Sequence, residues 1–140
     1  TWVSEDGRAI AFDTGPANAM IDDWVRAHTT LPFDQEGQLA GQGIVNEIAL
    51  SALLNHPYFD RPSPKSLDRN TFSSMPIEGL SLEDGAATLV AFTAKSISRA
   101  QHLLPARPLR WLVTGGGRHN PSLMGALRRH LHARVLQKHP

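Results

Sequence analysis

Apolar residues recur at helical spacing in four parts of the chain, and this pattern predicts four helices. The helices are predicted at residues 16–28, 44–56, 81–104 and 120–131. Ser81 and Asp84 form a start that resembles a capping box for the third helix, and Asn120 with Pro121 caps the fourth. The apolar face of the second helix is predicted to consist of Ile44, Ile48, Leu50, Leu53 and Leu54.

Shorter apolar runs predict strands before and after these helices. The strands are predicted at residues 1–4, 8–13 and 109–114 and at Val135-Leu136. Asp6-Gly7 is a tight-turn signal, so the first two strands form a hairpin. The segments 30–43 and 57–76 are rich in proline and polar residues and are predicted to be loops. This order of elements indicates an α/β fold in which helices flank a mixed sheet.

The composition limits the classes of function. The chain has 140 residues, of which 41% are hydrophobic, so it can form a single domain with its own core. Its net charge of +1 is too small for a dedicated nucleic-acid-binding protein. It has no cysteine, which excludes disulfides and thiolate metal sites. No apolar run approaches the ~20 residues that cross a membrane, so we expect a cytoplasmic protein that binds neither membranes nor nucleic acids.

Two predicted strand-to-helix corners contain glycine. The first is Asp13-Thr14-Gly15-Pro16, and the second begins at Gly115 and ends at Asn120. The first N–H groups of a helix have no partner within the helix, and together with the helix dipole they attract anions. Glycine lets a phosphate approach without meeting a Cβ. The two corners together therefore favour a phosphate-binding site, although a plain tight turn remains the alternative at each.

Asp13-Thr14-Gly15 also allows an aspartic protease, whose catalytic aspartates lie in this tripeptide. Such enzymes need two aspartates that share a proton in a β-rich fold. The helix predicted after Pro16 disfavours that interpretation. A non-catalytic nucleotide-binding or interaction module remains a second alternative.

Four segments, in this order, carry a resemblance to one family. They are AFDTGPANAMIDDW, HPYFDRPSPKSLDRNTF, ATLVAFTAKSI and WLVTGGGRHNPSLMGAL. The chain resembles the anhydro-N-acetylmuramic acid kinases of the sugar kinase/heat-shock protein/actin superfamily. The resemblance implies one lobe of an actin-like, ribonuclease-H-like ATPase fold. Because the family's Gly-Thr-Ser-x-Asp-Gly loop is not in this sequence and residue 1 is threonine, we expect residues 1–140 to be the second lobe of a longer kinase, inactive alone.

The resemblance also implies an activity and its cofactors. Family members use ATP and Mg²⁺ to phosphorylate 1,6-anhydro-N-acetylmuramate on its 6-oxygen, while water opens the anhydro ring, in peptidoglycan recycling. Asp13 would be the general base, and the family suggests a homodimer. The implied ATP contacts are Thr14, Gly15 and Asn18 at the first corner and Gly115, Gly116, Gly117 and Asn120 at the second.

The loop PKSLDRN departs from the family pattern, Pro-Lys-Ser-Thr-Gly-Arg-Glu. Leu67, Asp68 and Asn70 stand where the family has Thr, Gly and Glu, which puts in doubt any role that needs that Glu or a glycine backbone. Lys65 and Arg69 remain candidates for sugar contacts, with a structural loop as the alternative. No protein metal site is predicted.

Overall fold

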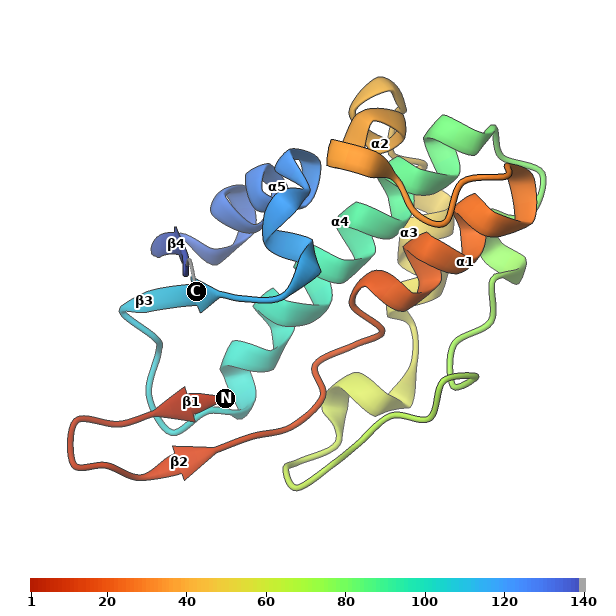
Figure 1. Cartoon of the computed structure of the whole chain (residues 1–140). Coiled ribbons are helices and arrows are strands. Elements are labelled where there is room, and N and C mark those ends of the chain that lie inside the picture. Colours follow the sequence, from red (N-terminus) through yellow and green to blue (C-terminus); the bar gives the residue numbers. More distant parts are fainter. Residues whose placement is uncertain (139–140) are drawn as a thin grey trace.

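A long helix, α4 (Leu82–Ala100), runs through the middle of the structure, and the other helices pack around it (Figure 1). The computed structural model describes residues 1–138. As predicted, the hydroxyl of Ser81 accepts a hydrogen bond of 3.1 Å from the backbone N–H of Asp84 at the start of this helix. The sequence pattern predicts one buried stripe, whereas every residue from 85 to 94 is buried, because α4 has neighbours on several sides.

Within residues 1–138, four further α-helices accompany α4. They are α1 (Asn18–His28), α2 (Gln38–Gln42), α3 (Glu47–Leu54) and α5 (Pro121–Leu131). Short 3-10 helices lie at η1 (Gln35–Gly37), η2 (Pro57–Asp60), η3 (Met75–Ile77), η4 (Gln101–Leu103) and η5 (Gly116–His119). Helices α1, α4 and α5 confirm the prediction. None of the helices in this described part of the chain combines the length and apolar character needed to cross a membrane.

In the described part of the chain, the strands form two small sheets. β1 (Trp2–Val3) pairs antiparallel with β2 (Ala9–Ile10), as the predicted hairpin requires. β3 (Arg110–Val113) pairs parallel with β4 (Arg134–Gln137), and α5 is the connection between them. The α/β class is therefore confirmed, but one antiparallel pair and one parallel pair replace the single mixed sheet that was predicted.

Two local predictions were wrong. Segment 30–43 is not a plain loop, because the carboxylate of Asp34 accepts hydrogen bonds from the N–H groups of Leu39 (2.8 Å) and Ala40 (3.0 Å) and stabilises the first turn of α2. Helix α3 begins at Glu47 rather than 44, because the side chain of Asn46 accepts a hydrogen bond from Ala49 and caps it there. Ile44 and Ile48, assigned to the apolar face, are 78% and 84% exposed.

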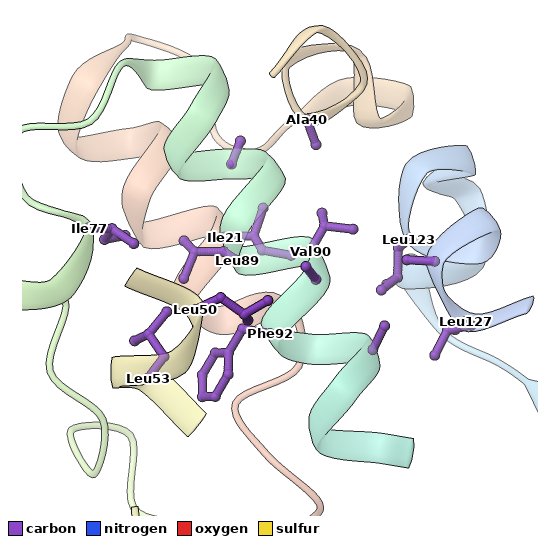
Figure 2. Close-up of a cluster of buried hydrophobic side chains, with 14 of the residues drawn as sticks. Ile21, Ala40, Leu50, Leu53, Ile77, Leu89, Val90, Phe92, Leu123 and Leu127 are labelled. Atoms are coloured by element: carbon purple, nitrogen blue, oxygen red, sulfur yellow. The ribbon is translucent and has the colours of Figure 1, made fainter. Parts of the chain in front are cut away.

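The core surrounds α4 (Figure 2). Ile21 of α1 and Leu50 of α3 pack with Leu89 and Phe92 on one side of α4, whereas α5 supplies Leu123 and Leu127 on the other side. Trp24 packs on Gly85, where a Cβ would lie 2.6 Å from the indole Nε1, and that nitrogen donates to the carbonyl of Leu82 at 2.9 Å. Helix α4 is thus the rigid base on which α1 and α5 are placed.

Candidate functional site

The first glycine corner connects the hairpin to α1. Strand β2 ends at Ile10 and α1 begins at Asn18, so Asp13 lies in the connecting segment and is exposed. The residue before the helix, Ala17, has a φ of 49° and no capping side chain. A positive φ is uncommon for a residue with a Cβ. The N–H of Ala19 donates to the carbonyl of Pro16 at 3.1 Å, and because no side chain of the described residues caps α1, other N–H groups of its first turn can meet an anion.

Helix α4 packs against this corner. A Cβ added at Gly15 would lie 2.8 Å from Cβ of Ser96, so only glycine fits here without movement. The hydroxyl of Thr93 donates to the carbonyl of Ala17 at 3.1 Å. Residues 15–17 are therefore fixed relative to α4 by one close packing contact and one hydrogen bond.

The second glycine corner meets the first. After β3 the chain turns at Gly115, whose φ is 78°, and passes through η5 before α5. Gly115 and Gly116 are exposed and have open space where a Cβ would be. Gly117 is buried, and its Cβ would lie 3.0 Å from Nδ2 of Asn18, the first residue of α1. The start of α1 and the turn before α5 therefore lie side by side (Figure 1).

Asn120 has a clear structural role at the second corner. Its side-chain oxygen accepts a hydrogen bond of 3.0 Å from the N–H of Leu123, so it caps α5 as predicted. The side chain is buried and lies against Gly37. The structure gives Asn120 this capping role, and its contact with a nucleotide stays a prediction.

A groove of about 450 Å³ lies over α4 between α2 and α5. Its floor consists of small residues, among them Gly41, Ala87 and Ala91, and it begins beside Pro121 and Ser122, which directly follow the second corner. Titratable side chains line it as well. They are Glu47, Lys95, Arg129 and His130. Burial, with contributions from Lys95 and Arg129, lowers the pKa of His130 from its usual 6.5.

Asp13 is held by a distant part of the chain. The hydroxyl of Tyr58 donates to the carbonyl of Asp13 at 2.6 Å, and the N–H of Leu67 donates to Oδ2 of Asp13 at 2.9 Å. The N–H of Asp13 in turn donates to the carbonyl of Lys65 at 3.5 Å. Sequence reasoning missed Tyr58 and Leu67, because contacts across 45 and 54 residues leave no local pattern.

Comparisons with known proteins identify the family of the chain. The family described as anhydro-N-acetylmuramic acid kinase matches residues 1–139. The chain belongs to this family. Anhydro-N-acetylmuramic acid kinases from Rhodospirillum rubrum and Paramagnetospirillum magneticum are 56% and 52% identical over alignments of 132 and 138 residues, which cover 94% and 96% of this chain. The aligned parts are 35% and 39% of those relatives, so the chain spans little more than a third of their length.

The loop PKSLDRN, which departs from the family pattern, is held by contacts of its two basic residues with the rest of the chain. Lys65 is buried, and its ammonium donates to the carbonyl of Tyr58 at 2.8 Å and lies 4.3 Å from the centre of the Tyr58 ring. Arg69 is exposed and forms an ion pair of 2.9 Å with Asp23 of α1. The sugar contacts expected of Lys65 and Arg69 stay predictions, and both cations already have partners in the chain.

The residues at the site suit Mg²⁺ only if a nucleotide brings most of the ligands. Residues 1–138 hold no cluster of three or more acidic or histidine side chains that could form a protein metal site. Mg²⁺ in kinases is typically held by one or two carboxylates and by the phosphates. The exposed carboxylate of Asp13, the first residue of the first corner, fits such a limited role.

Proposed function

We propose that this chain is the second lobe of a two-lobed kinase that transfers the γ-phosphoryl group of ATP to 1,6-anhydro-N-acetylmuramate. One observation carries the proposal, the packing of Asn18 on Gly117, because it brings two glycine corners and an uncapped helix start to one place. Membership of the family supports the same activity. The other lobe, with its own phosphate loop, would lie outside residues 1–140.

Asp13 acts as the general base in this proposal. It takes a proton from water, whose oxygen forms a bond to the anomeric carbon of the sugar. The bond from that carbon to the 6-oxygen breaks, and the 6-oxygen takes the γ-phosphoryl group as ADP leaves. The products are N-acetylmuramate 6-phosphate and ADP. An exposed carboxylate whose backbone is fixed on both sides suits this role, since general bases act from a defined position.

ATP lies across the two corners. Thr14, Gly15 and Asn18 face its terminal phosphates, and the open backbone at Gly115 and Gly116 admits the phosphate chain. The groove beside Pro121 and Ser122 takes the nucleoside, because its floor of small residues suits a flat base. Bound Mg²⁺ would neutralise the phosphate charge. Because the reaction consumes ATP, we place it in the cytoplasm, where its product enters peptidoglycan recycling.

A chimeric kinase tests the proposal. In it this chain replaces the matching 132-residue segment of the Rhodospirillum rubrum relative, and release of ADP is measured with 1,6-anhydro-N-acetylmuramate as acceptor. Asp13→Asn is expected to lower kcat by about 10²–10⁴ while ATP still binds, since that is the usual contribution of a general base. Asp68→Asn, the same change at an exposed position of the nearby loop, is the matched control and should leave kcat unchanged.

Three outcomes separate the alternatives. Near-normal turnover by Asp13→Asn would reject Asp13 as the base. A chimera that binds ATP without turnover would instead support the non-catalytic nucleotide-binding module. The 140-residue chain alone is the negative control, and we expect no measurable activity from it.

A further inference from the structure

Segment 58–67 forms three hydrogen bonds with Asp13. The Tyr58 hydroxyl donates to the carbonyl of Asp13, and the Leu67 N–H donates to Oδ2 of Asp13. The N–H of Asp13 donates to the carbonyl of Lys65. In the described residues, Oδ2 is the only carboxylate oxygen of Asp13 that accepts a hydrogen bond. Oδ1 is therefore the oxygen left to meet a reacting molecule.

Tyr58 is itself fixed by an aromatic cluster. Only 2% of it is exposed, and its ring lies edge-on to the rings of Phe59 and Phe72. The Phe72 ring stacks on the Phe59 ring and lies edge-on to the Phe92 ring of α4, with 5.4 Å between ring centroids in both pairs. Rings packed in this way have little freedom to move. The phenol oxygen is thus tied through the cluster to α4, the helix that also supports Gly15.

The buried side chain of Lys65 stabilises the same segment. Its ammonium bonds the carbonyl of Tyr58 and lies over the Tyr58 ring, with the Phe12 ring at 5.5 Å on the Asp13 side. Burial, with a further contribution from Arg61, lowers the pKa of Lys65. A buried ammonium needs such partners. The side chain of Lys65 thereby connects Tyr58 to Phe12, the residue before Asp13.

The Tyr58 hydroxyl is available as a donor at neutral pH. Burial and then the charge of Asp13 raise the pKa of Tyr58 above its ordinary 10.0. Because the phenol keeps its proton, its hydrogen bond to the Asp13 carbonyl persists through the range in which a kinase works.

We infer that Tyr58 is a positioning residue for the reaction, which orients the Asp13 carboxylate by holding the Asp13 backbone. This inference rests on the proposed function of Asp13. It also explains why Leu67 can stand where the family pattern has Thr. The group that bonds Asp13 there is the backbone N–H, which any residue except proline supplies.

A double-mutant cycle in the chimeric kinase tests the inference. Tyr58→Phe removes the hydroxyl and keeps the ring, so the fold should persist. We expect kcat to fall about tenfold to hundredfold with the KM for ATP within twofold, because a base misplaced by about 1 Å can lose ~10² in rate. In the Asp13→Asn background, Tyr58→Phe should change kcat less than about twofold, since residues that act as a unit are not additive.

Thr29→Val is the matched control. It removes a hydroxyl that donates to a backbone carbonyl at 2.8 Å, that of Val25 near the end of α1, without removing a bond to Asp13, and it should leave kcat within about twofold even if stability falls. Unchanged kcat in Tyr58→Phe would overturn the inference. So would an equal loss of kcat in both backgrounds, because the hydroxyl would then not act through Asp13. Near-normal kcat in Asp13→Asn alone would refute the proposed base, whereas the three hydrogen bonds between Asp13 and segment 58–67 would stand.

Discussion

The substitution Gly116→Ala separates the fold of the second corner from its use. The backbone of Gly116 lies outside the left-handed region, and beyond its two chain neighbours no atom of residues 1–138 lies within 4 Å of the position that a Cβ would take. The folded protein therefore has room for the methyl group. Alanine should even raise the free energy of unfolding by about 0.4–1 kcal/mol, because it restricts the unfolded chain.

The same methyl group would stand where the nucleotide is proposed to approach. If it displaces one hydrogen bond to a phosphate, the loss is about 1.5–3 kcal/mol. Since 1.4 kcal/mol corresponds to a factor of ten, the Kd for ATP should rise at least about tenfold. Gly117→Ala offers a contrast, because its Cβ would lie 3.0 Å from Asn18 and 3.2 Å from Leu123; it should lower stability as well.

Isothermal titration calorimetry of the chimeric kinase with ATP, beside urea denaturation of each variant, measures both quantities. The expected pattern is a stable Gly116→Ala protein with weakened ATP binding. A Gly116→Ala variant that binds ATP as tightly as the parent would refute the placement of the nucleotide at this corner. A large loss of stability would show that the folded protein has no room for a methyl group at position 116.

Two further predictions concern stability. Gly85→Ala should lower the free energy of unfolding by about 1–3 kcal/mol in urea denaturation, since the added methyl would overlap the Trp24 indole; an unchanged midpoint would show that α1 can shift from α4. The lowered pKa of His130 means that, as pH falls through 6.5, the unfolded state takes up a proton before the folded state does, so stability falls. His130→Gln should reduce that fall between pH 7.5 and 5.5, and an identical pH dependence in parent and variant would contradict it.

The sequence was informative where the signals are local. Ser81 and Asn120 mark the starts of α4 and α5 because each cap acts within three residues of the helix it begins. The glycines at both corners were recognised for the same reason. The short helix α2 was missed, since its stabilising residue, Asp34, bonds N–H groups five and six positions away. Ile44 preceded the Asn46 cap, so helical periodicity could not apply to it.

The least predictable part of the site was the link between its pieces. Nothing near Asp13 in the sequence indicates Tyr58, and nothing in the glycine turns indicates that Asn18 packs on Gly117. These contacts arise from how α1, α5 and segment 58–67 pack on α4. Lys65 illustrates the same limit, because its side-chain type suggested a sugar contact, which stays a prediction, and gave no sign of its hydrogen bond to Tyr58.

The contact of Ser96 with Gly15 restricts which residues position 96 can accept during evolution. Its side chain is 1% exposed, bonds the carbonyl of Phe92, and leaves space only for a glycine above it. A mutational scan of the chimeric kinase, scored by ADP release, should therefore find position 96 almost as intolerant as Asp13 itself, with only alanine or glycine accepted. Purifying selection at this buried hydroxyl would then record the shape of the corner, although the serine meets neither ATP nor sugar.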